Sequence, residues 1–357
     1  MFSLSSSFRR LPDLNLVASA ALVLGFSNSC GGKSERVLRE GSSAEASHRD
    51  RDTDKEGEPS PDGHDGDRDQ GDSDGDDLPP VYDRSRAGTC ARWNADTSER
   101  GEGTWNGDVR ECEPGDVSTN GRENALRVVN LHRWLADLPP VETSDERNEL
   151  AQECALLQEA NWRERGLSHV PRESWKCYSE AGAQGAITSN LSTGPGVLSV
   201  PAYFLELGNQ AAMGHRRIIL SNELGPIGLG ATGPGGASCL QALPGTMNAA
   251  RAWVAWPPPG VFPLAAYEFA RRSLSETGWS IQSDYIDLSG AKVLVTSGRR
   301  ALDVEVAELE PSAGSKSAIR IVPNGWTVHA GETYVVSVTG IRPTIEYEVE
   351  IVDCSSD

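Results

Sequence analysis

The chain has 357 residues and a formal net charge of −19, with 33 Lys and Arg against 52 Asp and Glu. This length is enough for two domains with buried cores, because single cores rarely grow beyond ~300 residues. Since the chain is acidic and has no cluster of Lys and Arg that could neutralise phosphates, we expect no nucleic acid partner.

The first 30 residues are typical of an export signal. Arg9 and Arg10 precede an apolar segment at residues 14–24, and small residues lead to Cys30. The apolar segment is too short for a membrane-spanning helix, which needs ~20 residues. Cys30 stands where bacterial lipoproteins carry their acylated cysteine, which predicts a lipid anchor at the cell surface or in the periplasm. Ser27 occupies the place where a lipoprotein signal usually has Leu, so cleavage near ASA or SNS followed by secretion is the alternative.

Residues 31–86 are predicted to be a disordered acidic linker. They are rich in Asp, Glu, Gly and Ser, and a segment with so few large apolar side chains cannot offset the entropy of ordering. The run DGHDGDRDQGDSDGDD resembles a calcium loop, but its sixth position, counted from Asp72, is Asp77 where an EF-hand needs Gly. We therefore interpret the run as a solvated spacer.

Six further cysteines are expected to form disulfides. Their even number in an exported chain, without any CxxC spacing, favours disulfides over metal ligands. Six cysteines allow fifteen pairings. The simplest hypothesis joins neighbours in the sequence: Cys90 with Cys112, Cys154 with Cys177, and Cys239 with Cys354.

Regular structure is expected to begin after the cysteine-bracketed segment, residues 87–118. The sequence ENALRVVNLHRWLADLPPV, residues 123–141, has apolar side chains at helical spacing up to Pro139 and Pro140, which predicts an amphipathic helix. His132 lies beside the apolar stripe of this helix and has no acidic or histidine neighbour in the sequence. We expect it on the helix surface.

A second helix is predicted to begin with Thr143 and Glu146, which have capping-box spacing, and to end near Arg165 before Gly166. A third, short helix is predicted to begin at Pro201.

The sequences IGLGATG and RAWVAW are predicted to be strands of one sheet. Gly228, Gly230 and Gly233 satisfy the pattern GxGxxG, but no helix is expected after them. We therefore predict no nucleotide site there.

The run WPPPGVFP, residues 256–263, marks a domain boundary because its prolines interrupt regular structure. Beyond it apolar residues alternate with polar ones, as in strands with one buried face. Residues 257–357 are thus predicted to form an Ig-like β-sandwich of roughly 100 residues. The alternating residues are Val293 and Val295; Leu302, Val304 and Val306; Ile319 and Ile321; Val336 and Val338; and Ile345, Tyr347, Val349 and Ile351.

Four residues before this boundary are candidates for chemistry: His169, Glu180, Glu206 and His215. Imidazole nitrogen and carboxylate oxygen suit Zn²⁺ or a similar divalent ion. The motifs HExxH and GxSxG are absent from the sequence, so the standard metallopeptidase and α/β-hydrolase arrangements have no support.

The order of several motifs resembles the CAP superfamily, which comprises cysteine-rich secretory proteins, antigen 5 and pathogenesis-related proteins, in its bacterial form. These motifs are VNLHRWLADLPPV, LSH, SEAGAQGAI, LELGNQAAMGHRRIIL and PIGLG. The resemblance covers roughly residues 123–256, and GHRRIIL with the strand after it is its most specific part. It implies an α-β-α three-layer sandwich (SCP domain) for residues 119–256, and thus an α+β chain overall.

The resemblance also implies a cleft that holds two histidines and two acids. His169 of LSH is similar to the first histidine of the family and His215 of GHRR to the second. Glu180 matches the Glu of the family's GEN motif, although here it stands in SEAGA without that Gly and Asn. Glu206 matches the second acid. Asn130 and Arg133 resemble the helix residues that brace the core.

Three functions follow as hypotheses. The first is a monomeric, membrane-tethered binding module whose cleft takes a lipid, glycan or peptide, since the family has no single shared reaction. The second is a zinc-assisted hydrolase in which His169 and His215 bind the metal and Glu180 or Glu206 is the general base. The third is a structural role for the four residues, with partner recognition elsewhere on the surface.

Overall fold

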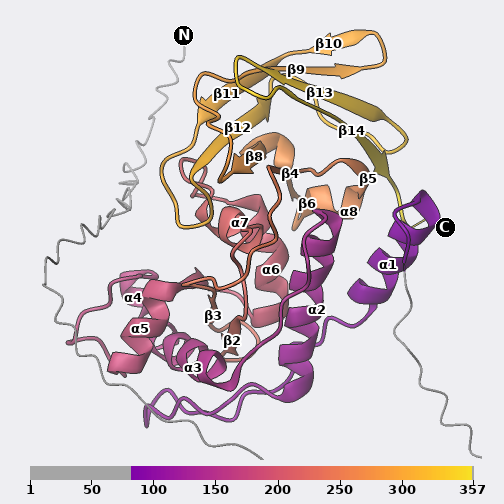
Figure 1. Cartoon of the computed structure of the whole chain (residues 1–357). Helices are drawn as coiled ribbons and strands as arrows, with labels where there is room; N and C mark the ends of the chain where they lie inside the picture. Colours follow the sequence, from indigo (N-terminus) through magenta and orange to yellow (C-terminus); the bar gives the residue numbers. More distant parts are fainter. Residues whose placement is uncertain (1–81, 356–357) are drawn as a thin grey trace, which may run out of the picture. The chain divides into compact units, whose positions relative to one another are not determined.

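The computed structural model describes residues 82–355, which belong to one compact unit (Figure 1). The predicted export signal, the acylation of Cys30 and nearly all of the acidic linker lie outside the described residues. Between residues 82 and 355, no helix is both long and apolar enough to cross a membrane.

The described chain is an α+β structure, as predicted. Its helices are α1 (Arg86–Ser98), α2 (Thr119–Leu135), α3 (Asp145–Glu159), α4 (Trp162–Arg165), α5 (Glu180–Thr188), α6 (Gly196–Leu205), α7 (Gly214–Ile219), α8 (Leu264–Tyr267) and α9 (Leu274–Thr277). Its strands are β1 (Ser189–Ser192), β2 (Gly228–Ala231), β3 (Ser238–Gln241), β4 (Val254–Trp256), β5 (Gly260–Pro263), β6 (Glu268–Phe269), β7 (Arg272–Ser273), β8 (Trp279–Ser283), β9 (Lys292–Ser297), β10 (Arg300–Leu302), β11 (Val304–Glu308), β12 (Ser317–Pro323), β13 (Thr333–Thr339) and β14 (Ile345–Val352).

The first half of this unit has three layers. An antiparallel sheet with the strand order β1-β3-β2 lies in the middle. Successive side chains of a strand point to opposite faces of a sheet, so Cys239 of β3 faces α3, whereas Leu240 packs with the core that includes α2 and α6. The sheet is therefore covered by α3 and α5 on one face and by α2 and α6 on the other (Figure 1).

The glycines of the GxGxxG pattern serve this packing and do not form a nucleotide loop. Gly228 and Gly230 lie on β2, where an added Cβ would come within 2.3 Å or less of backbone atoms of Arg147 and Ala151 in α3. Gly233 has a φ of +88° in the turn that follows. The sequence therefore uses glycine where helix and strand backbones approach closely.

The second half consists mainly of two sheets whose apolar side chains join one buried core (Figure 1). The first has the order β10-β9-β13-β14-β5 and the second the order β11-β12-β8-β4. The alternation predicted for residues 345–351 is confirmed, because Ile345, Tyr347, Val349 and Ile351 are buried. Residues 302–306 do not form one strand, since Leu302 ends β10 and Val304 begins β11 in the other sheet.

The prediction that IGLGATG and RAWVAW share a sheet was wrong. Within RAWVAW only Val254–Trp256 forms a strand, β4, and it pairs with β8 of the second half. Hydrophobic alternation indicates a strand but does not select its partner, and here the partner is the fully buried β8.

Three helix boundaries differ from the predictions. A helix, α1, already occupies the first part of the cysteine-bracketed segment, residues 86–98. The cap of α3 is Ser144, whose side chain accepts from Arg147 N, and α3 ends at Glu159 before the short α4, which stops at Gly166 as predicted. Pro201 lies inside α6 and does not begin it. Burial of Val197 and Val200 in the core stabilises α6 across this proline.

His132 is buried, not on the helix surface as predicted. It is 2% exposed, and its ring stacks on Phe204 and Trp256 at centroid distances of 4.3 and 5.5 Å. Its Nδ1 lies 2.8 Å from Val128 O. Burial lowers the pKa of His132 to about 4, although the Val128 hydrogen bond opposes the shift. The residue is therefore a neutral aromatic member of the core.

We predict that His132 makes the fold sensitive to acid. The unfolded chain binds a proton at this residue below about pH 6.5, whereas the native state binds it only below about pH 4. Stability present above pH 6.5 is thus lost as the pH falls towards 4, by on the order of 3 kcal/mol. The free energy of unfolding, measured with urea at several pH values, should depend less steeply on pH for His132→Phe than for the wild type. The exposed His329→Asn is the control, and equal slopes for His132→Phe and the wild type would contradict the prediction.

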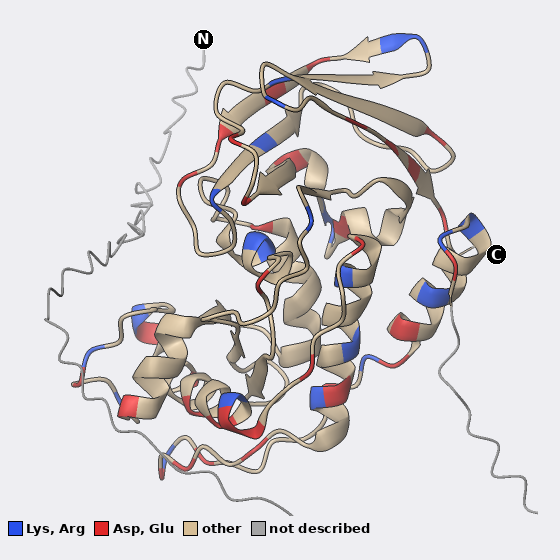
Figure 2. Ribbon diagram, in the orientation of Figure 1, with Lys and Arg blue, Asp and Glu red and all other residues tan. Residues whose placement is uncertain are grey.

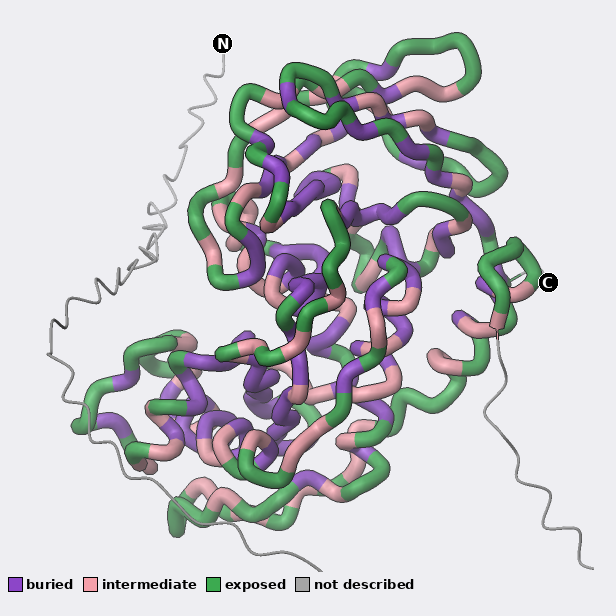
Figure 3. The backbone as a smooth tube through the Cα atoms, viewed as in Figure 1, coloured by how far each residue is buried: buried purple, intermediate pink, exposed green. Residues whose placement is uncertain are grey.

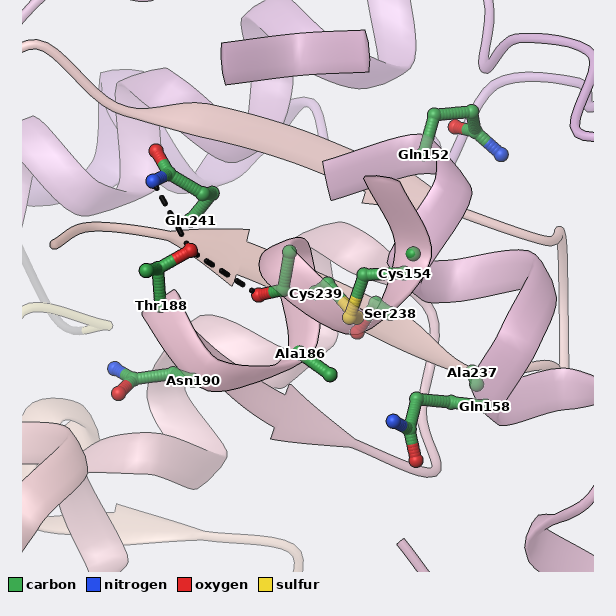
Figure 4. The surroundings of a disulfide bond; sticks show 12 residues. Gln152, Cys154, Gln158, Ala186, Thr188, Asn190, Ala237, Ser238, Cys239 and Gln241 are labelled. Atoms are coloured by element: carbon green, nitrogen blue, oxygen red, sulfur yellow. Dashed lines mark hydrogen bonds between the residues drawn. A yellow bond between two sulfur atoms is a disulfide. The ribbon is translucent and has the colours of Figure 1, made fainter. Parts of the chain in front are cut away.

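The structure contains three disulfides, and all three predicted pairings were wrong. The pairs are Cys90–Cys354, Cys112–Cys177 and Cys154–Cys239. Pairing neighbours in sequence minimises the entropic cost of closing the loops. The fold, however, brings distant segments together. Helix α1 packs on α2 and β5, which places Cys90 beside the last residues, where Asn94 Nδ2 donates to Cys354 O. Figure 4 shows Cys154 of α3 joined to Cys239 of β3 beside Thr188 and Gln241.

We predict that Cys90–Cys354 is a major stabiliser, because it closes a loop of 264 residues and a crosslink restricts the unfolded chain more as the loop grows. Replacing both cysteines by Ser should lower the free energy of unfolding by roughly 2–5 kcal/mol. Denaturant titration under oxidising conditions measures this loss. The double serine variant of Cys112 and Cys177, which span 65 residues, should lose less. An unchanged midpoint after removal of Cys90–Cys354 would contradict the prediction.

Candidate functional site

The turn between α6 and α7 brings two predicted site residues into contact. Glu206 after α6 and Met213 before α7 are both left-handed, with φ of 52° and 47°. The chain folds back between them, so that Glu206 Oε2 lies 3.0 Å from His215 Nδ1. The Glu206 side chain is fully buried, whereas the His215 side chain is 25% exposed.

Glu206 also caps α7. Its Oε1 accepts a hydrogen bond of 2.6 Å from Arg216 N, one of the amides that a helix start leaves unpaired. Its Oε2 also accepts from Asn209 Nδ2 at 2.8 Å. Both carboxylate oxygens are thus occupied by donors of the protein. This geometry makes Glu206 a residue that orients His215.

His169, in the loop after α4, is held in a similar way by a backbone carbonyl. Its Nδ1 lies 2.8 Å from Ala186 O near the end of α5. Because a carbonyl can only accept, the proton of the neutral ring is on Nδ1 and the lone pair is on Nε2. The same argument applies to neutral His215 beside the Glu206 carboxylate. Both histidines therefore present Nε2 as the free acceptor.

The two histidines influence each other electrostatically. Although His169 is exposed as a residue, desolvation of its ring lowers its pKa, and the neighbouring His215 lowers it further, while the bond to Ala186 O opposes both effects. A positive charge on His215 therefore disfavours the protonated form of His169. His169 is available as a neutral base at a lower pH than an ordinary histidine.

Glu180 does not join this arrangement in the way the resemblance implied. It is the first residue of α5 and is exposed, where its charge stabilises the helix start. In the part of the chain that the structure describes, no group of three or more His, Cys, Asp or Glu side chains is placed to hold a metal ion. The structure brings together Glu206 and His215, with His169 nearby.

Two buried arginines beside His215 were missed by the sequence reasoning. Arg216 donates to Phe204 O, Gly278 O and Ser280 Oγ. Arg217 donates to Ala212 O, Glu310 O and Ser315 O. Figure 2 shows these basic residues on α7 in the middle of the molecule. Their signal in the sequence is a pair of arginines directly before the apolar run IIL.

The charge of Glu206 partly compensates these arginines. Burial lowers the pKa of both Arg216 and Arg217 to about 10, and the Glu206 carboxylate opposes the shift in each. Both guanidinium groups therefore remain charged near neutral pH.

The wall of the site comes from β1 and α6. The Tyr203 ring lies 5.1 Å from the His215 ring, and its hydroxyl donates to Asn190 O. Asn190 Nδ2 in turn donates to His215 O.

Asn130 and Arg133 of α2 hold neighbouring segments through backbone hydrogen bonds. Asn130 bonds both backbone groups of Val141, and Arg133 donates to Pro139 O, Ile219 O and Ser221 O. Arg133 thus ties α2 to the end of α7, whereas Asn130 holds the segment that follows α2.

Comparison with known proteins identifies no relative: no family model, no curated protein and no solved structure matches the chain.

We predict that Glu206→Gln destabilises the protein by about 3 kcal/mol or more, because it removes a buried charge and replaces an acceptor with a donor. Urea unfolding measures the loss. The matched control is Glu180→Gln, which removes an exposed charge from the start of α5 and should change stability by less than about 1 kcal/mol. Equal stabilities of the two variants would show that the Glu206 contacts contribute little.

Proposed function

We propose that the chain is an exported, membrane-tethered binding protein of the CAP type, whose ligand contacts His169 and His215. The observation that carries the proposal is the orientation of the two imidazoles, which are both held through Nδ1 and both have a free Nε2. Such preorganisation favours binding, since the rings lose little freedom when a ligand arrives.

Two findings, one on the cellular compartment and one on the order of the layers, support the proposal. Three disulfides fit an oxidising compartment outside the cytoplasm. The three-layer arrangement of α3 and α5, the β1-β3-β2 sheet, and α2 and α6 agrees with the α-β-α order that the CAP resemblance implies. Tethering through Cys30 and membership of the family are parts of the proposal.

A divalent metal fits this site only in part. His169 and His215 would hold Zn²⁺ through Nε2, and Glu206 would orient His215 from behind, as a carboxylate often does for a metal-bound histidine. Glu206 cannot itself be a ligand in this arrangement because both of its oxygens accept hydrogen bonds from the protein. Zn²⁺ would therefore need further ligands from water or from the bound molecule.

The same contacts make a zinc-assisted hydrolase the second candidate. A hydrolase needs a carboxylate that is free to take a proton from water. Glu206 is occupied, and Glu180 is exposed at the start of α5. A purely structural role suits Glu206 but leaves the free Nε2 of each histidine unexplained. Binding of a lipid, glycan or peptide thus agrees best with the geometry.

We predict that the purified full chain binds Zn²⁺ with an affinity in the micromolar range and that His169→Ala/His215→Ala abolishes this binding. Isothermal titration calorimetry at pH 7 measures both, with circular dichroism to confirm that the double variant folds. Glu180→Gln is the matched control and should bind as the wild type does. Equal binding by the wild type and the double variant, or no binding by either, would contradict a role for the two imidazoles as ligands.

A further inference from the structure

One of the three disulfides differs from the other two in its exposure. Cys112 is exposed and Cys177 is half-buried, so a reductant can reach this bond from solvent. The cysteines of the other two disulfides are at most 5% exposed: Cys90, Cys154, Cys239 and Cys354. Exposed disulfides are reduced more readily than buried ones. Thiol chemistry at the surface of the folded protein is therefore directed to Cys112–Cys177.

The backbone is strained at both ends of this bond. Cys112 has a φ of 57° and Cys177 a φ of 56°. These values lie in the left-handed region, which a residue with a Cβ adopts only at a cost in free energy. Once the bond is broken, the backbone is free to relax at both positions. Strain thus adds to exposure in favouring the reduced form of this disulfide.

The disulfide holds the tip of a surface hairpin, residues 107–113. None of these residues is buried, and Figure 3 shows their segment of the tube in green and pink. The backbones of Asp108 and Glu113 donate to each other. Within residues 82–355, the hydrogen bonds of the tip stay inside it, apart from a contact of 3.4 Å between Cys177 Sγ and Val109 O. The tip therefore depends on the disulfide for its attachment to the molecule.

The disulfide also joins two walls of a groove beside α3. The groove has a volume of about 560 Å³, and its walls include Gly115 after the tip, Ala181 of α5 and Glu153 of α3. Cys112 shortly precedes Gly115 in the sequence, and Cys177 shortly precedes Ala181. A crosslink at this place limits how far the two walls can move apart.

We propose that Cys112–Cys177 is a redox switch, which a dithiol of the kind found in exported thiol oxidoreductases reduces while the other two disulfides stay intact. A thiolate of the dithiol attacks the more exposed Sγ of Cys112, and Cys177 leaves as a thiolate. The second thiol of the dithiol then displaces Cys112. The dithiol becomes a disulfide, and its two electrons and two protons pass to the cysteines. Reduction frees the tip and opens the groove.

The first test is reduction of the folded full chain with dithiothreitol in the absence of denaturant. Free thiols are alkylated at intervals and identified by mass spectrometry. Cys112 and Cys177 should be labelled roughly tenfold faster, or more, than the cysteines of the two buried disulfides. Equal rates for the three disulfides, or slower labelling of this pair, would overturn the proposal.

The second test follows the tip and the groove after selective reduction. The amides of Asp108 and Glu113 should exchange hydrogen roughly tenfold faster than in the oxidised protein, because the tip has lost its attachment. Glu153 is half-buried in the groove and should react more with carbodiimide and glycine ethyl ester. The exposed Glu348 of β14 is the internal control and should react equally in both states. Unchanged exchange of the tip, or unchanged labelling of Glu153, would contradict the switch.

Cys112→Ser/Cys177→Ser is the matched variant. Without reductant it should show the fast exchange of the reduced wild type, and dithiothreitol should change it no further. A further increase with dithiothreitol would assign the effect to another disulfide and would also overturn the proposal. The reduced wild type gives the same information if the variant fails to fold. None of these outcomes depends on the histidine site.

Discussion

The buried carboxylate of Glu206 is the contact on which much of the described structure depends. It caps α7 through Arg216 N, orients the His215 ring, and supplies negative charge near Arg216 and Arg217. A buried charge is costly unless it is paired and hydrogen-bonded, and Glu206 is both. The left-handed turn that begins at Glu206 makes this possible because it returns the chain to the same carboxylate.

The two arginines extend this network into the second half of the molecule. Arg216 bonds Gly278 and Ser280 beside or within β8, and Arg217 bonds Glu310 and Ser315. From the other direction, Gln282 of β8 donates to Arg217 O and Leu220 O. Each of these is a long-range contact, and apart from Glu310 every partner is buried. The helix that carries His215 is therefore positioned by both halves, so the β-sheets contribute to the geometry of the site.

Covalent links add a further constraint at the edges of the molecule. Cys90–Cys354 ties the first helix to the last described residues, and Cys112–Cys177 ties the loop between α1 and α2 to the segment before α5. Cys154–Cys239 crosslinks α3 to the sheet at a buried position. The network around Glu206 orders the interior, whereas the first two disulfides hold peripheral segments that bury few side chains.

Local patterns in the sequence were enough to predict helix α2, the stop at Gly166 and the alternation of β14, and the α+β class followed from them together with the CAP resemblance. They also singled out His169, Glu180, Glu206 and His215 as candidates, since these residue types stand at helix ends and in loops. Such features depend on periodicity and on residues close in the chain, so they can be read without the fold. Tertiary structure alone decided the cysteine pairing, the sheet to which β4 belongs, the burial of His132 and the exposure of Glu180. It also set the Nδ1 partners of the two histidines and the burial of Arg216 and Arg217. These properties depend on contacts between segments far apart in sequence, where packing overrides local preference.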